Sequence, residues 1–454
     1  MRDQLQRVVE KFLLQHHDGR RPLLLALSGG PDSLTLLHLL HACCETLNIA
    51  YAIAHLDHGW REESGQEAAQ LEQLSRQLRV PFHCKKASFS EVRGNLEASG
   101  RQARLRFFRR LCLRYDYQAV LLAHHKDDQA ETVLKNVLEG ANLSSCSGIK
   151  DLVVIDDLAI WRPLLEVPKS DLLKWLENHR LMPFFDPTNE DPRFLRGRLR
   201  TQIIPEMTRL FGKGITSSLC HIGKDAQELH RYLEEKLGPL LQTADVSATG
   251  SFLDLSSTCP KSPLEVKFIL RRICRQHHCS LSREILEQGA DHLLLRSANR
   301  AFSMGKFTLH IDRGRIFLSP FSFSVIPAKR VELERTMRYG LWLVATERSR
   351  GGGRLFSDWK KVWKGRTEVI LPLGTKPYHI GSPCLQHPFP RTSPLRKWWN
   401  LHKVPAFLRS VTPVIWYGDH MAHEFLTGQN THKIEANEES LKVVLTRENE
   451  FESE

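Results

Sequence analysis

Three features that would each point to a different class of protein are missing from this chain of 454 residues. No two of its 10 cysteines are spaced as CxxC, so the usual zinc-binding pattern is absent. No apolar run reaches the ~18 residues of a membrane span, and the first residues, MRDQLQRVVEKFLLQ, have the charge pattern of an amphipathic helix rather than a signal peptide. We therefore expect a cytoplasmic protein with reduced cysteines and no membrane partner.

The composition is basic, with a formal net charge of +12 and a pI near 9.3. This excess favours a polyanionic partner without requiring one. The chain is too long for a single core, and we expect about two to four domains.

The segment LALSGGPDSLTLLHLL, residues 25–40, joins an apolar strand to an apolar helix through a glycine-rich turn. No lysine follows the last glycine, so the turn is not the GxxxxGK[ST] loop of kinase-type enzymes. Glycines let the backbone approach a ligand, and the helix N-terminus attracts negative charge. We expect a pyrophosphate site, although an ordinary strand-to-helix turn is the structural alternative. The residues of the turn are Ser28, Gly29, Gly30, Pro31, Asp32 and Ser33.

Strands and amphipathic helices alternate in the first third of the chain, with strands expected at 22–28, 49–56, 80–85 and 118–124. This rhythm predicts an α/β fold with a parallel, doubly wound sheet. Ligands of such sheets bind at the carboxyl ends of the strands. The further motifs of the chain fall at such ends, which indicates that they form one site.

Two of these motifs are rich in basic and imidazole groups. HLDHGWR follows the second strand and contributes His55, His58 and Arg61, which suit a nucleotide or a polyanion, while a structural role for His55 stays equally open. In NLEASGRQARLRFFRRLCLRY, residues 95–115, Arg101 and Arg104 share one helix face, and we interpret them as phosphate or RNA ligands rather than a solvated basic face.

The motif AHHKDDQAETVLKNVL, residues 123–138, crowds His124, Asp127, Asp128 and Glu131 onto a turn and the start of a helix. Neighbouring carboxylates repel one another, so they need a shared cation, either magnesium or the ammonium of an amine substrate. Capping of the helix by Asp127 is the structural alternative, and it explains one acid rather than three.

The loop SGGPDS resembles the PP-loop of the N-type ATP pyrophosphatases, and the order of motifs narrows the resemblance to one family. SGGPDS, HLDHGWR, NLExxxRxxR, AHHKDDQAET, WRPLL and DPTNEDPRFLRGRLR closely resemble the catalytic domain of tRNA(Ile)-lysidine synthetases over residues 20–207. The resemblance implies that ATP adenylates C2 of cytidine 34 in the CAU anticodon of an isoleucine tRNA. Free lysine then displaces AMP.

The resemblance also implies a role for each matching residue. The PP-loop, with His55, would bind ATP, and Asp32 and Asp127 would place Mg2+. His124, Asp128 and Glu131 would face the lysine amine as candidate bases, with Asp32 counted among the catalytic residues. The residues expected to contact tRNA in this part of the chain are His58, Arg61, Arg101, Arg104, Arg196, Arg198 and Arg200.

The chain departs from the family pattern at three places. Leu105 replaces an aromatic residue, Gly197 replaces the common asparagine of RNRxR, and the loop 140–150 lacks its usual arginine. We expect these changes to affect substrate affinity more than reaction type.

The rest of the chain is expected to form further domains around a catalytic domain at 1–216. A small, mostly helical domain at 217–322 has helical patterns at 217–243, 263–278 and near 283–295, and two strands at 307–312 and 315–319. A linker at 323–335 leads to a small α+β domain at 336–454. Its tryptophans either fill a core or stack on RNA, and similarity to the family's C-terminal domain favours tRNA contacts by Arg350, Arg354, Lys397 and Arg409.

Three other functions are compatible with parts of the sequence. A 2-thiocytidine thiolase shares the loop but usually carries CxxC pairs. A metabolic PP-loop synthetase, making GMP or NAD, would leave the basic C-terminal domains without a role. A catalytically silent tRNA-binding protein would not need Asp32 or the Asp127–Asp128 pair. Whether the chain forms a homodimer stays open.

Overall fold

The structure is a computed structural model that describes residues 3–57, 64–86, 96–184, 193–247, 250–258, 260, 262–320, 327–350, 358–383, 395–430 and 439–447. The chain divides into two compact units, Met1–Tyr232 and Leu233–Glu454, with the boundary inside helix α9 (Thr216–Leu241). The domain boundaries expected at residues 216 and 322 stay predictions, and part of the expected linker, 321–326, lies outside the described residues.

The first unit contains a six-stranded sheet in the order β3-β2-β1-β4-β6-β5. Five strands pair in parallel, and β5 pairs with β6 in antiparallel fashion. The four strands expected from the sequence are all present, although β4 is shorter than predicted, and the β5–β6 hairpin was not predicted. The strands are β1 (Leu23–Ala26), β2 (Tyr51–Asp57), β3 (Phe82–Lys86), β4 (Val120–Leu121), β5 (Leu152–Ile155) and β6 (Leu158–Trp161).

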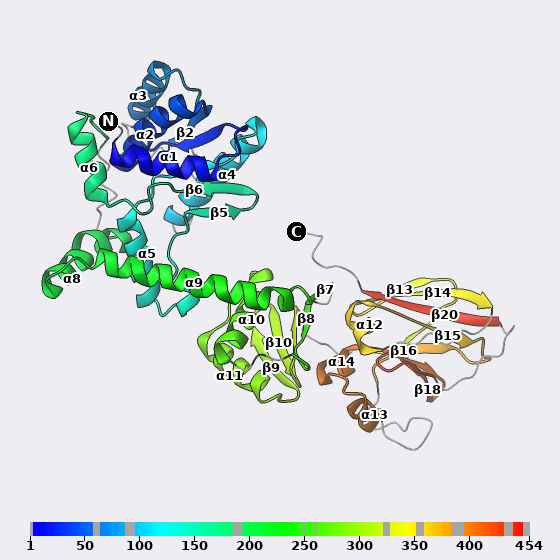
Figure 1. Ribbon diagram of the computed structural model, residues 1–454. Coiled ribbons are helices and arrows are strands. Elements are labelled where there is room, and N and C mark those ends of the chain that lie inside the picture. Colours follow the sequence, from blue (N-terminus) through cyan, green and yellow to red (C-terminus); the bar gives the residue numbers. More distant parts are fainter. Residues whose placement is uncertain are drawn as a thin grey trace. The chain divides into compact units, whose positions relative to one another are not determined.

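Helices cover both faces of this sheet, which confirms the doubly wound α/β fold (Figure 1). Alternate residues of β1 face opposite sides, because side chains alternate along a strand. Leu23 and Leu25 join the core beneath α1 (Gln4–His16), α2 (Pro31–Leu47) and α6 (Lys169–Asn178). Leu24 instead joins the core beneath α4 (Leu96–Tyr115). Helix α3 (Ser64–Gln77) packs beside β2 and β3.

Helix α5 (Lys126–Leu138) starts beyond the end of β4 and joins a third apolar cluster. Its residues Ala130, Val133 and Leu134 pack against Leu199 and the first turns of α9. Leu199 begins a π-helical segment, Leu199–Ile203, between α7 (Leu195–Arg198) and α8 (Ile204–Phe211). This packing brings residues near 200 to the start of α5.

The second unit begins with a lobe, residues 233–320, whose antiparallel sheet has the order β7-β8-β11-β10-β9. Helices α10 (Pro263–Gln276) and α11 (Arg283–Leu294) pack on it, close to the helical patterns expected from the sequence. The sequence predicted two of the five strands. These strands are β7 (Asp245–Ser247), β8 (Gly250–Asp254), β9 (Arg300–Met304), β10 (Phe307–Asp312) and β11 (Arg315–Ser319).

The C-terminal lobe of the second unit, residues 327–447, contains a five-stranded and a four-stranded antiparallel sheet. The first consists of β12 (Lys329–Arg330), β16 (Tyr378–Gly381), β17 (Val414–Tyr417), β18 (His420–Glu424) and β19 (Gln429–Asn430). The second consists of β13 (Thr336–Tyr339), β14 (Trp342–Arg350), β20 (Glu439–Arg447) and β15 (Arg366–Pro372).

Three short helices, α12 (Trp359–Trp363), α13 (Leu395–Leu401) and α14 (Ala406–Val411), complete this lobe. One apolar cluster includes Phe252 and Phe317 of the first lobe together with Trp363 and Trp399 of the second. The two lobes therefore share a core. Among the described residues, no helix combines the length and apolar character needed to span a membrane.

Candidate active site

The glycine-rich turn adopts a closed conformation at the carboxyl end of β1. The Ser33 hydroxyl accepts a hydrogen bond from the Ser28 amide at 3.3 Å and donates to the Gly30 carbonyl at 3.0 Å. The Ser28 and Ser33 hydroxyls lie 3.0 Å apart. Pro31 occupies the first turn of α2, where its missing N–H costs no hydrogen bond. The strand-turn-helix arrangement predicted from the sequence is present, and the N-terminus of α2 is suited to an anion, while the pyrophosphate site itself stays a prediction.

Gly29 is the position of the turn where a side chain is least tolerable. Its φ of 84° lies in the left-handed region, and an added Cβ would come within 2.3 Å of the Phe184 ring. The Phe184 amide also donates to the Gly29 carbonyl at 2.9 Å. The chain after α6 therefore packs directly against the loop.

Asp32 lies beside His125, the residue that precedes α5. The distance from Asp32 Oδ2 to His125 Nε2 is 3.5 Å, and the same nitrogen lies 3.4 Å from Asp128 Oδ2. His125 Nδ1 lies 3.7 Å from Asp127 Oδ2. The imidazole, only 1% exposed, is therefore surrounded by three carboxylates that come from two motifs distant in sequence.

The charges of this cluster stabilise one another. Burial alone would raise the pKa of Asp32, but the hydrogen bond and charge of His125, with Lys169 and Arg200 beyond, lower it overall. Burial alone would lower the pKa of His125, but Asp32, Asp128 and Asp127 raise it above its usual value. His125 and the three carboxylates thus form one cluster of close contacts, and the shared cation expected from the sequence, magnesium or a substrate ammonium, stays a prediction.

Asp127 and Asp128 each make a main-chain contact as well. Asp127 Oδ2 accepts from the Lys169 amide at 2.8 Å, at the start of α6, so it caps a helix other than its own. Asp128 Oδ2 accepts from the His125 amide at 3.0 Å, at the start of α5. Both carboxylates are therefore held in fixed positions.

Glu131 and Arg200 form a paired fork on the other side of Asp128. Arg200 donates from Nε to Glu131 Oε1 at 2.7 Å and from Nη2 to Oε2 at 3.0 Å, and Nη2 also contacts Asp128 Oδ1 at 3.1 Å. Burial raises the pKa of Glu131, and Arg200 offsets this only in part. Arg200 was expected to contact tRNA, and the structure places it inside the acidic cluster.

His124 is held by an arginine that the sequence analysis did not single out. Arg162 Nε donates to His124 Nδ1 at 3.2 Å, and its Nη1 donates to the Lys150 carbonyl at 2.6 Å. Burial lowers the pKa of His124 to about 4, and the charges of Arg162, Arg196 and Arg101 add to this against the opposing charge of Asp128. The structure thus brings His124 together with two arginines expected to contact tRNA.

His55 has the surroundings of a structural residue. It is buried on β2, its Nδ1 lies 2.8 Å from the Leu27 carbonyl, and its ring stacks on Phe82. Because a carbonyl only accepts, Nδ1 carries the proton. Arg101, Arg104, Arg196 and Arg198 are exposed, while His58 and Arg61 lie outside the described residues.

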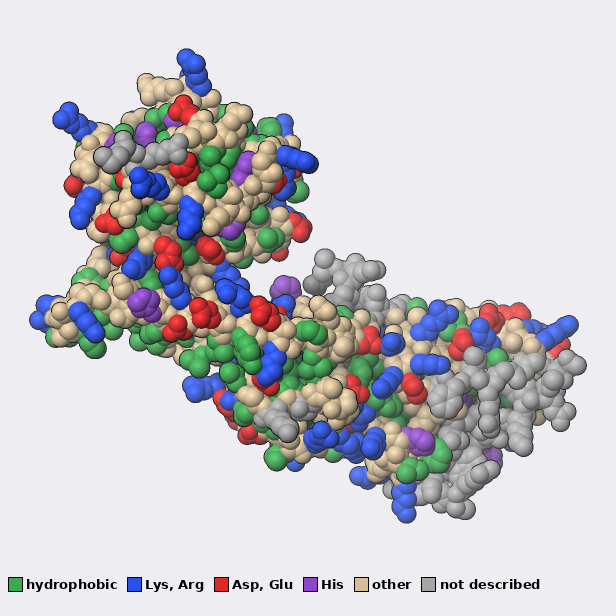
Figure 2. All heavy atoms as spheres, in the orientation of Figure 1, with side chains coloured by type: hydrophobic (Ala, Val, Ile, Leu, Met, Phe, Trp, Pro, Cys, Tyr) green, Lys and Arg blue, Asp and Glu red, His purple; other side chains and the backbone are tan. Residues whose placement is uncertain are grey.

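The tRNA ligands expected in the second unit differ in surroundings. Arg350 and Lys397 are exposed, and Arg354 lies outside the described residues. Arg409 is buried, and its Nε and Nη2 both donate to the Val404 carbonyl, at 3.2 and 2.6 Å. This contact gives Arg409 a structural role and leaves it little exposed for the tRNA contact expected from the resemblance to the family's C-terminal domain. On the face drawn in Figure 2, basic side chains are spread over both units among acidic ones.

The carboxylates also suit a magnesium ion bound together with nucleotide. Asp32 Oδ1 is buried and has no hydrogen-bond partner among the described residues, so one oxygen is left for a cation. No group of three or more His, Cys, Asp or Glu side chains is arranged to hold a metal within the described ranges. Magnesium is commonly held by one or two carboxylates and substrate phosphates, which Asp32 and Asp127 can satisfy.

Comparisons with known proteins agree with the motifs. A family model described as a PP-loop domain matches residues 1–207. A tRNA(Ile)-lysidine synthase of Protochlamydia amoebophila is 38% identical over 441 residues, 96% of this chain and 96% of that protein. One from Chlamydia trachomatis serovar A is 34% identical over 304 residues, 66% of this chain and 94% of that protein.

Among solved structures, the U34-tRNA thiolase NcsA from Methanococcus maripaludis with its 4Fe-4S cluster aligns with a TM-score of 0.41 and 18% identity, over 49% of this chain and 78% of that chain. Such a distant similarity decides nothing about function. The PP-loop match and the similarity over nearly the whole length to curated relatives confirm the resemblance drawn from the motifs: the chain belongs to the tRNA(Ile)-lysidine synthase family.

Proposed function

We propose that this enzyme joins the ε-amine of free lysine to C2 of cytidine 34 in the CAU anticodon of an isoleucine tRNA, with ATP as the activating substrate. The observation that carries the proposal is the meeting of Asp32, from the pyrophosphate-binding turn, with the acidic start of α5, where Asp32 and His125 lie 3.5 Å apart. This contact supports a proposed phosphate site in the turn that adjoins a proposed cation site at the acidic start of α5.

The first step activates a poor leaving group. The C2 oxygen of cytidine attacks the α-phosphorus of ATP, a new P–O bond forms, and pyrophosphate leaves. The turn formed by Ser28, Gly29, Gly30 and Ser33 binds the leaving pyrophosphate through its N–H groups and the start of α2. Magnesium, when bound at Asp32 and Asp127, would neutralise phosphate charge.

The second step is a substitution by lysine. The ε-amine attacks C2, the bond from C2 to oxygen breaks, AMP leaves with the electron pair, and the nitrogen loses a proton. We place the lysine ammonium beside Asp128 and Glu131, whose negative charges attract it. Glu131 is the better suited proton acceptor, because burial raises its pKa, whereas His124 has a pKa of about 4.

Arg200 contacts both carboxylates, and its single positive charge offsets one of their two negative charges. An amine that enters the site would therefore share the carboxylates with this guanidinium. Arg101, Arg104, Arg196 and Arg198 are exposed, and Arg101 and Arg196 act on His124 through their charge, which favours contact of these arginines with the tRNA backbone or with AMP.

The experiment that tests the proposal measures AMP release from labelled ATP by the purified protein. AMP should appear only with the CAU-bearing isoleucine tRNA. Asp32→Asn should abolish AMP formation while the affinity for that tRNA stays within about twofold, because Asp32 belongs to the turn proposed to bind the pyrophosphate and not to the residues proposed to bind tRNA. Near-normal AMP formation by Asp32→Asn would remove the turn from the reaction.

A further inference from the structure

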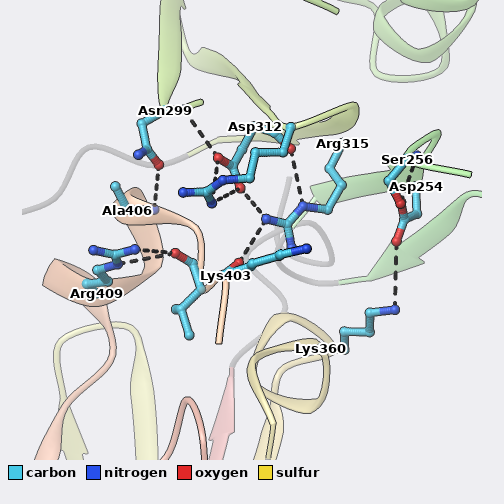
Figure 3. Close-up of polar contacts among 11 residues, drawn as sticks. Asp254, Ser256, Asn299, Asp312, Arg315, Lys360, Lys403, Ala406 and Arg409 are labelled. Atoms are coloured by element: carbon cyan, nitrogen blue, oxygen red, sulfur yellow. Dashed lines mark hydrogen bonds and ion pairs between the residues drawn. The ribbon is translucent and has the colours of Figure 1, made fainter. Parts of the chain in front are cut away.

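Arg315, on β11 of the second unit, joins the two lobes from a buried position. Its Nη2 forms an ion pair with Asp312 and also donates to the Lys403 carbonyl at 2.8 Å, while its Nε donates to the Asp312 carbonyl at 3.2 Å. Figure 3 shows Arg315 pointing from the first lobe toward Lys403 of the second. Arg315 is 6% exposed and Asp312 is 2% exposed.

The segment that Arg315 contacts is a tight turn, residues 402–405, between α13 and α14. Lys403 has a φ of 52°, in the left-handed region, so the chain reverses there. The carbonyls at the end of a helix lack partners within the helix. Two arginines donate hydrogen bonds to such carbonyls here. Arg315 donates to the Lys403 carbonyl, and Arg409 donates to the Val404 carbonyl. The turn is therefore held from both sides.

Neighbouring contacts reinforce the same junction. Asn299 Oδ1 accepts from the Ala406 amide at 3.1 Å, while the Asn299 amide donates to Asp312 Oδ1 at 3.2 Å (Figure 3). The rings of His310 and Phe407 stack with centroids 4.0 Å apart. The first lobe thus contacts both the turn at 402–405 and the beginning of α14 through polar and aromatic side chains.

A second polar contact between the lobes is of a different kind. Lys360 Nζ lies 3.8 Å from Asp254 Oδ2, and these side chains are 53% and 33% exposed. Exposed ion pairs of this length contribute little. A buried arginine that donates to a main-chain carbonyl instead fixes distance and direction, because breaking this hydrogen bond leaves a carbonyl without its partner. Arg315 therefore provides a buried contact by which the first lobe holds the turn.

The lobes carry exposed basic residues on both sides of this junction. Arg296 and Arg300 belong to the first lobe, and Arg396, Lys397 and Lys403 belong to the second. Phosphates of a folded RNA have fixed spacings, so lysines and arginines held at fixed spacings bind them at a lower entropic cost.

We propose that Arg315 is a positioning residue for tRNA binding. It locks the turn at 402–405 onto the first lobe, so that basic residues of the two lobes act as one rigid surface. The inference rests on the proposed function for the identity of the RNA, and it assigns to Arg315 and Asn299 a role in substrate affinity that leaves the chemical steps unchanged.

The test compares Arg315→Gln, the milder Asn299→Ala and the matched control Lys360→Gln. Arg315→Gln should raise the KM for tRNA by about tenfold and Asn299→Ala by about threefold, with kcat and the KM for ATP within about twofold of the parent enzyme. Lys360→Gln should change none of these. Hydrogen exchange of residues 395–411 should quicken in the first two variants only.

Three outcomes would overturn the inference. A fall in kcat with an unchanged KM for tRNA, in the variant that folds best, would show a merely structural role. Faster exchange with unchanged tRNA affinity, measured directly by equilibrium binding, would separate the turn from tRNA. Unchanged hydrogen exchange of residues 395–411 in Arg315→Gln and Asn299→Ala would show that these residues do not hold the turn in place. If the parent enzyme forms no lysine adduct, the proposed function fails instead, and binding and exchange still decide on Arg315.

Discussion

Arg200 grips both carboxylate oxygens of Glu131, with Nε 2.7 Å from Oε1 and Nη2 3.0 Å from Oε2. The two residues are 69 positions apart in the sequence. Arg200 lies in the π-helical segment Leu199–Ile203, and its side chain reaches Glu131 near the start of α5. The side chain of Glu131 is 5% exposed, so this carboxylate depends on the pairing. The lysine ammonium of the proposed second step is placed beside this pair.

Arg200→Gln should destabilise the protein and impair catalysis. Loss of the guanidinium leaves Glu131 buried without its partner, which should lower the free energy of unfolding by ~2 kcal/mol, less than for a fully buried pair because Arg200 is 26% exposed. Urea unfolding checks the stability, and AMP release checks the activity.

The matched control is Arg209→Gln, which removes an Arg–Glu fork of the same type on the surface of α8, where the side chains of Arg209 and Glu206 are 68% and 53% exposed. No measurable change is expected there. Equal effects of the two substitutions would contradict the role given to burial at Glu131.

Glu131→Gln and Asp32→Asn should stop the reaction at different steps. Asp32→Asn should prevent formation of the adenylated tRNA. Glu131→Gln should still release pyrophosphate but slow the transfer of lysine by about 100-fold or more, because the amide cannot accept the proton of the amine. Single-turnover experiments with labelled ATP follow the adenylated tRNA directly. Rapid lysine transfer by Glu131→Gln would assign the proton to another group.

Gly29→Ala tests the close approach of the turn to Phe184. The substitution combines a left-handed backbone with a Cβ that would lie 2.3 Å from the ring, so the turn must shift and the KM for ATP should rise. Gly19→Ala is the matched control, because Gly19 has a similar φ of 75° with open space around it. We expect a loss of ~1 kcal/mol in the control without any change in the KM for ATP. A normal KM in Gly29→Ala would show that ATP does not contact this turn.

His310 should make the second unit sensitive to mild acid. Burial lowers its pKa to about 4, below the ordinary value of 6.5. Below pH 6.5 His310 is protonated in the unfolded chain but stays neutral in the folded chain. Stability is therefore highest above pH 6.5 and falls as the pH drops toward 4. The loss between pH 8 and pH 5 should be about 2 kcal/mol.

His310→Phe should remove this part of the pH dependence while keeping a ring against Phe407. Urea unfolding followed by tryptophan fluorescence at the two pH values measures the difference between parent and variant. The same pH dependence in both proteins would mean that His310 is protonated when folded.

The sequence predicted those parts of the fold that depend on local pattern. The strand before Ser28 and the strands at 307–312 and 315–319 were expected and are present, because alternating or continuous apolar residues leave a clear signal. The hairpin of β5 and β6 was missed. Its two four-residue strands are joined by Asp156 and Asp157, which both have left-handed backbone conformations. The turn contains no glycine, so the sequence gives no clear signal for it.

The roles of individual side chains were harder to predict, because they depend on which segments meet. The acidic motif indicated a shared cation, magnesium or a substrate ammonium, and this stays a prediction, whereas the contact of His125 with Asp32 depends on two distant segments meeting. Arg162 lies in the WRPLL motif, yet its contact with His124 depends on β6 lying beside β4. The family resemblance gave Arg409 the role of a tRNA ligand, but the left-handed turn before α14 directs the Val404 carbonyl toward it.

The most direct test of lysidine synthesis is the mass of the nucleoside at position 34 after incubation of the enzyme with ATP, lysine and an isoleucine tRNA transcript that bears CAU. We expect the cytidine to gain lysine with loss of water. The gain should require both ATP and lysine, and it should be absent with Asp32→Asn and with uridine at position 34. An unmodified cytidine, despite AMP release, would contradict the account and would point to a different acceptor or a different nucleophile.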